Sequence, residues 1–147
     1  MEQPTTGTPA ASAAAPDALP RVLVVEDNPD TLEMLSLALT MIGYEVETAA
    51  DGQTALRAAA AHPPDAILCD IGLPDIDGHE VMRRLRALPG LAHTPAFALT
   101  GFGQEQDIER ARAAGFDAHL TKPVDLADLD RRLREALAGA AAPVPAT

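Results

Sequence analysis

Three carboxylates, a hydroxyl and an ammonium group stand at the ends of short apolar runs in this chain of 147 residues: Glu26, Asp27, Asp70, Thr100 and Lys122. Carboxylates that lie close together repel one another unless a cation lies among them. Oxygen ligands without cysteine or histidine favour Mg²⁺, which often binds phosphate as well. A carboxylate can also act as a nucleophile and accept a phosphoryl group, whose oxygens a divalent ion, an ammonium and a hydroxyl donor then stabilise. These residue types therefore indicate magnesium-dependent phosphoryl chemistry, provided that the fold brings them together.

Each of these residues also has an ordinary structural explanation. Asp70 could cap a turn, and Glu26 with Asp27 could cap the helix that follows them. Thr100 could be a plain strand residue, and Lys122 could be an exposed loop residue. Lys122 is nevertheless the only lysine among eleven basic residues. The coincidence of all five side chains at successive strand ends favours a shared site.

The segments before these side chains have the composition of strands. The run Ala66–Cys69 lies between Pro63-Pro64 and the turn-forming Asp77-Gly78, which predicts a short strand that is buried on both faces and ends at Asp70. Similar apolar segments predict strands over 21–25, 96–100 and 118–121, and an alternating segment predicts a half-buried edge strand over 44–49.

Helical periodicity predicts a helix after each strand. The first helix begins near Asn28-Pro29 and ends before Gly43. Its predicted apolar face consists of Leu32, Leu35, Leu39 and Ile42. The other helices are expected over 53–61, 78–88, 105–114 and from Asp125 onwards.

The alternation of strands and helices predicts an α/β fold. A single domain with a doubly wound, five-stranded parallel sheet and about five helices on its two faces satisfies this pattern. The carboxyl ends of parallel strands share one edge of the sheet, where open α/β folds place their ligand sites. We therefore expect the five polar side chains to meet at that edge.

Composition restricts the classes of function. The net charge of −11 disfavours a surface for nucleic acid or for an anionic membrane, because both would repel the protein. No apolar run approaches the ~20 residues of a membrane span, and the N-terminus lacks a signal-peptide pattern. The only cysteine, Cys69, lies in an apolar run, which fits a core residue and a reducing, cytoplasmic setting. Residues 1–19 and 139–147 are predicted to be disordered tails around a domain over 20–138.

Four motifs together resemble the receiver domain of response regulators in bacterial two-component signalling. They are Val-Leu-Val-Val-Glu-Asp-Asn at 22–28, Cys-Asp-Ile-Gly-Leu-Pro-Asp-Ile-Asp-Gly at 69–78, Ala-Leu-Thr-Gly at 98–101 and Leu-Thr-Lys-Pro at 120–123. The resemblance covers about residues 20–138 and is greatest to single-domain response regulators and to the receivers of hybrid histidine kinases. It implies a flavodoxin-like sheet with the strand order 2-1-3-4-5.

The resemblance also assigns roles to the acidic residues. It implies that Asp70 accepts the phosphoryl group. It further implies that Mg²⁺ is held by Glu26, Asp27, Asp70 and the backbone carbonyl of Gly72.

The same resemblance implies a switch. Lys122, in a cis peptide bond with Pro123, would pair with Asp70 and later with its phosphate. Thr100 would turn toward the phosphoryl group and alter the face built from the helix over 105–114, the strand over 118–121 and the final helix. The switch residue three positions before the lysine is usually aromatic in the family, whereas this chain has His119. That histidine could rotate or titrate, or it could be a partly exposed residue of an end strand.

These roles predict a stand-alone receiver that takes its phosphoryl group from a sensor histidine kinase or a histidine phosphotransfer protein. It would signal by a conformational switch to a protein partner or through a phosphorelay. Such a protein is a self-catalysing phosphoacceptor rather than a classical enzyme, and it is a monomer or weak homodimer with no nucleic-acid or membrane partner. The alternative is a receiver-like adaptor that works without phosphorylation. An aspartyl phosphatase is disfavoured, because Gly72 stands where such enzymes usually carry a second acid.

Overall fold

The computed structural model of the chain describes residues 19–101 and 108–141. The tails predicted over 1–19 and 139–147 lie mostly outside these residues, as does the start of the helix predicted over 105–114. None of the helices within the described residues is long and apolar enough to cross a lipid bilayer.

Five parallel strands form one sheet in the order β2-β1-β3-β4-β5. The strands are β1 (Arg21–Val25), β2 (Glu45–Ala49), β3 (Ala66–Asp70), β4 (Ala96–Thr100) and β5 (Ala118–Thr121). The helices in the described residues are α2 (Pro29–Ile42), α3 (Gly52–Ala61), α4 (Gly78–Arg86), α5 (Ile108–Ala114) and α6 (Leu126–Ala141). The predicted α/β class and the strand order 2-1-3-4-5 are therefore confirmed.

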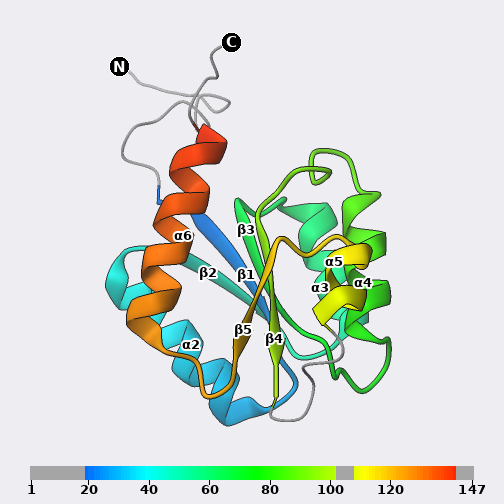
Figure 1. The fold of residues 1–147 in the computed structure, drawn as a ribbon, viewed down its shortest axis with the longest axis horizontal. Coiled ribbons are helices and arrows are strands. Elements are labelled where there is room, and N and C mark those ends of the chain that lie inside the picture. The colour runs from blue at the N-terminus through cyan, green and yellow to red at the C-terminus, as the bar shows by residue number, and fades with distance from the viewer. Residues whose placement is uncertain (1–18, 102–107, 142–147) are drawn as a thin grey trace, which may run out of the picture.

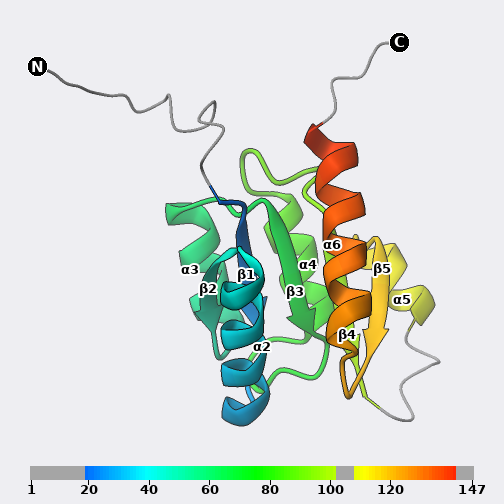
Figure 2. The same cartoon turned by 90° about the vertical axis from the view of Figure 1, so that its left-hand side faces the viewer.

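Helices cover both faces of the sheet. Helices α2 and α6 lie on one face, and α3, α4 and α5 lie on the other (Figure 1, Figure 2). Successive side chains of a strand point to opposite faces, so β1 contributes Leu23 and Val25 to one core and Val22 and Val24 to the other. Two covered faces explain why β1, β3 and β4 are apolar without alternation.

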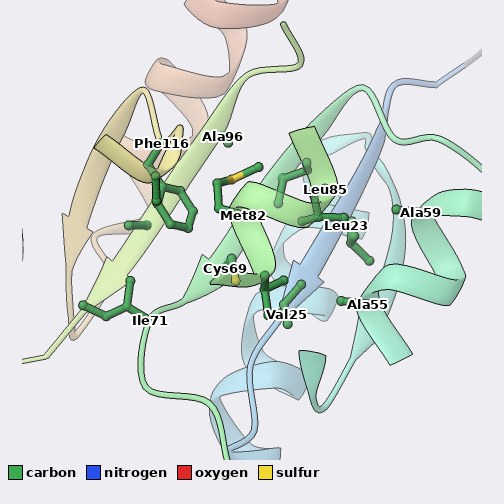
Figure 3. Close-up of a cluster of buried hydrophobic side chains, with 14 of the residues drawn as sticks. Leu23, Val25, Ala55, Ala59, Cys69, Ile71, Met82, Leu85, Ala96 and Phe116 are labelled. Atoms are coloured by element: carbon green, nitrogen blue, oxygen red, sulfur yellow. The ribbon is translucent and has the colours of Figure 1, made fainter. Parts of the chain in front are cut away.

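The two cores consist mainly of aliphatic side chains. The core beneath α3, α4 and α5 includes Cys69, Met82, Leu85 and Phe116 (Figure 3). The core beneath α2 and α6 includes Leu35, Leu39, Leu68, Leu129 and Leu133. Cys69 is fully buried, as expected for a core residue.

Helix α2 begins and ends at the residues that the sequence indicates. The Asn28 side chain accepts hydrogen bonds from the backbone N–H groups of Asp30 (2.9 Å) and Thr31 (3.1 Å). Gly43 ends the helix with a φ of 126°, a left-handed conformation that glycine adopts without strain. Because the N-cap Asn28 directly follows Asp27, the same turn that caps the helix also presents the two acidic residues.

Three local expectations are corrected. Ile42 was predicted on the apolar face of α2, but it is 40% exposed, whereas Leu39 on the same face is fully buried. Helix α4 ends at Arg86, two residues before the predicted end at Leu88, and its C-cap is Ala87. Helix α6 continues to Ala141, so residues 139–141, which were assigned to the tail, are helical.

A guanidinium group fixes the approach to β5, the strand that precedes Lys122. Arg86 donates hydrogen bonds to the carbonyls of Leu91 (2.9 Å), Thr94 (2.5 Å) and Gly115 (2.7 Å), and it pairs with Asp117 at 3.2 Å. The end of α4 is thereby tied to the loop that leads into β5.

The backbone passes very close to itself behind the phosphoacceptor candidate. A Cβ on Gly78 would lie 2.4 Å from the Cα of Ile71 and 2.5 Å from the carbonyl oxygen of Asp70. Both neighbours are backbone atoms, so they cannot move away without shifting the end of β3. Only glycine fits at this position, because any side chain would collide with these backbone atoms, although the φ of Gly78 is one that other residues adopt.

We expect Gly78→Ala to lower the free energy of unfolding by about 2–3 kcal/mol through overpacking. Gly90 has a φ of 85° but nothing within 4 Å of its Cβ position, so Gly90→Ala should cost only about 1 kcal/mol from backbone strain. Urea unfolding followed by circular dichroism measures both. Equal losses for the two variants would contradict the close contact.

Candidate functional site

The carboxyl ends of β1, β3, β4 and β5 meet at one edge of the sheet, as the sequence predicts. The register aligns these ends, because Val25 lies opposite Cys69, Asp70 opposite Leu99, and Thr100 opposite Thr121. The side chains of Glu26, Asp70 and Thr100 are buried at this edge, with 0%, 6% and 3% exposure. Asp27 is exposed, so the site is open to solvent beside buried carboxylates.

Lys122 is the centre of the site. Its Nζ lies 2.7 Å from Oε1 of Glu26 and 3.1 Å from Oδ2 of Asp70. Oε2 of Glu26 accepts a hydrogen bond from the backbone N–H of Asn28 at 2.9 Å. Oε1 of Glu26 accepts no hydrogen bond of favourable angle among the described residues. The ammonium charge of Lys122 is therefore what compensates that oxygen.

Burial and charge shift the acid–base equilibria in the site. Burial raises the pKa of Glu26, and Asp70 adds to the rise, while Lys122 and the Asn28 N–H lower it only in part. Partial burial would lower the pKa of Lys122, but its close contacts with the carboxylates of Glu26 and Asp70 raise it above the ordinary value. The ammonium therefore stays charged at neutral pH and offsets part of the cost of the buried carboxylates.

Asp70 is held on both of its oxygens. Oδ2 faces Lys122, and Oδ1 accepts a hydrogen bond from the backbone N–H of Gly72 at 2.9 Å. The carboxylate is thus fixed in orientation at the mouth of the site, which suits a nucleophile that reacts in one direction.

The acidic residues fit a hard divalent cation. Glu26, Asp27 and Asp70 each offer a carboxylate oxygen, and these atoms lie within 4.8 Å of one another. An all-oxygen donor set that is partly exposed to solvent suits Mg²⁺, which keeps several of its waters. These three residues would hold the ion, and the carbonyl of Gly72 remains a predicted ligand.

The two predicted switch residues lie on neighbouring strands. The Thr100 hydroxyl donates a hydrogen bond to the carbonyl of Leu120 at 3.4 Å. His119 lies on the edge strand β5, half-buried, beside a small cavity that is also lined by Ile108, Ala111 and Phe116. The peptide bond between Lys122 and Pro123 is cis, as predicted.

Sequence reasoning missed the carboxylates that hold the loop between β3 and α4. Asp75 accepts hydrogen bonds from the first two backbone N–H groups of α3, those of Gly52 (2.8 Å) and Gln53 (3.0 Å). Asp77 caps α4 through the N–H of His79 (2.6 Å), and the same oxygen lies 2.8 Å from Nδ1 of that histidine. An acid directly before a helix start is a recognisable cap signal at Asp77. No sequence signal links Asp75 to α3, because the contact spans two elements.

The family follows from comparison with known proteins. The chain matches the family model of the response regulator receiver domain over residues 22–134. The chain belongs to this family. The matched region runs from β1 into α6 and so includes every element that carries a residue of the site.

Two curated relatives are much longer than this receiver domain. The transcriptional regulatory protein KdpE of Mycobacterium tuberculosis is 42% identical over 116 residues, which are 79% of this chain and 50% of that protein. The virulence sensor protein BvgS of Bordetella pertussis is 37% identical in an alignment that covers 97% of this chain and 12% of that protein. The chain therefore spans half or less of the length of these relatives.

A solved receiver domain has the same fold. The receiver domain of the sensor histidine kinase PA1611 from Pseudomonas aeruginosa is 37% identical and superposes with a TM-score of 0.76. The match covers 82% of this chain and 98% of that one, and that structure holds a magnesium ion in its active site cleft.

Removal of the ammonium should destabilise the receiver in a pH-dependent way. In Lys122→Met, Glu26 and Asp70 are left unpaired, and we expect a loss of about 2–4 kcal/mol at neutral pH. The pKa of Glu26 is already raised in the folded protein. Above about pH 5 the folded variant therefore binds more protons than the unfolded chain does. Its free energy of unfolding should consequently fall as the pH rises toward 7. Urea unfolding across this range measures the slope.

Arg83→Met is the matched control. Arg83 pairs with Glu80 at 3.2 Å on an exposed helix face, so its loss should change stability by less than about 0.5 kcal/mol at every pH. A pH-independent loss in Lys122→Met would contradict the pairing of Lys122 with buried carboxylates.

Proposed function

We propose that this receiver domain accepts a phosphoryl group on Asp70 from a phosphohistidine of a sensor histidine kinase or a histidine phosphotransfer protein. The observation that carries the proposal is the position of Asp70, buried at the sheet edge, held on one oxygen by Gly72 and on the other by Lys122. Family membership supports the same function. The protein acts as a phosphoacceptor whose own side chains promote transfer, rather than as an enzyme with an external substrate.

The transfer step is a displacement at phosphorus. A bond forms between an oxygen of Asp70 and the phosphorus, and the bond from phosphorus to the ring nitrogen of the donor breaks. The electron pair of that bond returns to the donor histidine. Lys122 offers a fixed positive charge to the phosphoryl oxygens, and the hydroxyl of Thr100 is the nearest side-chain donor on β4.

Magnesium is proposed as the cofactor. Glu26, Asp27 and Asp70 supply the carboxylate oxygens, as an acidic cluster that fits a hard cation. The ion would supply positive charge that neutralises the incoming phosphoryl group. The magnesium ion in the PA1611 receiver supports this assignment.

The proposed output is a change in the face formed by α5, β5 and α6. Thr100 contacts the backbone of β5 through Leu120, which gives the phosphoryl site a direct neighbour on that face. A groove along the edge strand is lined by side chains of both charges, among them Arg112, Asp128 and Arg132, and also by His119. We propose that a downstream protein binds there and that His119 acts in the switch. A cytoplasmic location and a monomeric or weakly dimeric state remain predictions.

The decisive test is intact-mass analysis after incubation with Mg²⁺ and a small phosphodonor. We expect one phosphoryl adduct on the wild-type protein and none on Asp70→Asn. Asp65→Asn is the matched control, because Asp65 flanks the other end of β3, where its side chain accepts a hydrogen bond from the Arg21 N–H. An adduct that persists in Asp70→Asn would refute the assigned acceptor. No adduct from small donors or from a panel of phosphorylated histidine kinases would favour the phosphorylation-independent adaptor.

Magnesium should stabilise the folded protein in the absence of any phosphodonor. At a concentration ten times the dissociation constant, binding to the folded state alone contributes about 1.4 kcal/mol. Removal of one carboxylate ligand in Asp27→Asn should weaken binding by roughly tenfold. Thermal unfolding over a Mg²⁺ titration measures both. Equal stabilisation of the two proteins would exclude Asp27 as a ligand.

A further inference from the structure

The loop that follows the phosphoacceptor is held at its base by short backbone contacts. This segment, residues 71–77, is called the acceptor loop here, and it carries Gly72, whose N–H binds Asp70. At its base, the backbone N–H of Gly78 donates to the carbonyl of Ile71 at 3.1 Å. The close approach of Gly78 to Asp70 and Ile71 keeps the two ends of the loop together. These contacts close the base of the loop but leave its tip to be fixed by something else.

A carboxylate at the tip provides that second attachment. Oδ1 of Asp75 accepts the N–H of Gly52 at 2.8 Å, and Oδ2 accepts the N–H of Gln53 at 3.0 Å. Both donors lie in the first turn of α3, where backbone N–H groups have no partner within the helix. Two hydrogen bonds to an ionised group, at the positive end of a helix, form a strong and directional attachment.

The packing around Gly52 shows that the attachment is close. A Cβ on Gly52 would lie 2.7 Å from Cγ2 of Val81 and 3.1 Å from Cβ of Ile76. The start of α3 is therefore in direct contact with the acceptor loop and with α4. Desolvation raises the pKa of Asp75, but the hydrogen bonds from Gly52 and Gln53 lower it by more, so the carboxylate is ionised at neutral pH.

Helix α3 also has a cap of its own. Its N-cap residue, Asp51, already accepts the N–H of Thr54 at 2.8 Å. The first turn of α3 thus has two carboxylates, one from its own cap and one from the acceptor loop. The second binds two N–H groups that Asp51 leaves unpaired, and it thereby attaches the acceptor loop to the helix.

We propose that Asp75 is a positioning residue for phosphoryl acceptance. By attaching the acceptor loop to the N-terminus of α3, it holds Gly72 against Asp70 and orders the backbone that borders the cation site. This inference rests on the proposed function, because it concerns how the same site is organised. If the loop is already ordered before the cation binds, binding does not have to order it. The apparent dissociation constant for the cation equals the intrinsic dissociation constant divided by the fraction of protein in which the loop is ordered.

The test compares three variants of the full chain. Asp75→Ala removes both hydrogen bonds to α3. Asp75→Asn keeps one acceptor oxygen and should be intermediate. Asp51→Ala is the matched control, because it removes a cap from the same helix turn without touching the acceptor loop. Urea unfolding measures how much stability each variant loses, so that the readouts below are compared at conditions where all the variants are folded.

The first readout needs neither metal nor phosphodonor. In the metal-free protein, amide hydrogen exchange across residues 71–77 should accelerate in Asp75→Ala and remain at the wild-type rate in Asp51→Ala. The second readout is Mg²⁺ affinity by calorimetry. If the ordered fraction of the loop falls to about a fifth, the dissociation constant rises about fivefold in Asp75→Ala.

The third readout separates positioning from general damage. The rate of phosphoryl acceptance by Asp75→Ala should fall at low Mg²⁺ and return toward the wild-type rate at saturating Mg²⁺. Wild-type Mg²⁺ affinity and loop exchange in Asp75→Ala, or equal losses in Asp51→Ala, would overturn the inference while the proposed function stands. Failure of the wild-type protein to accept a phosphoryl group would instead defeat the proposed function, and the loop exchange would still report whether Asp75 orders the loop.

Discussion

The ammonium of Lys122 lies between two buried carboxylates from strands that are separated in sequence, 2.7 Å from Glu26 and 3.1 Å from Asp70. A buried carboxylate beside a second negative charge is costly in a medium of low dielectric. The site therefore requires β1, β3 and β5 to end at one level, and the register of the sheet meets that requirement. Arg86 contributes at a distance, because it fixes the loop that leads into β5.

The carboxyl edge gathers acidic residues for two different reasons. In a parallel sheet the helix that follows each strand starts at this edge, so the unpaired N–H groups of the helices also collect there. Asp51, Asp75, Asp77 and Asp125 bind such groups. Glu26, Asp27 and Asp70 instead lie close to one another, and Glu26 and Asp70 also pair with Lys122. The contacts of each acidic residue thus distinguish the residues that bind helix N-termini from the residues that could bind a cation.

Close backbone contacts tie the site to the fold. Gly78 lies against the end of β3, and Gly52 lies against Val81 of α4 and Ile76 of the acceptor loop. In such packing a displacement of a few tenths of an ångström in one element is felt by its neighbours. A displacement of the helices that flank the acceptor loop would consequently reach the site, although Asp27 is exposed to solvent.

The amino-acid sequence alone determined the α/β alternation, the five strands and the identity of Glu26, Asp27, Asp70, Thr100 and Lys122 as the residues of one edge. Apolar runs and turn residues are local signals, and the rule that parallel strands share an edge converts them into proximity. The strand order came from resemblance to a family and not from these local signals. Only the tertiary structure decided that Glu26 is the fully buried acid, that Ile42 is exposed and that Asp75 holds the start of α3. Those outcomes depend on contacts between elements that are tens of residues apart in the sequence. The spacing of side chains along a single element does not predict such contacts.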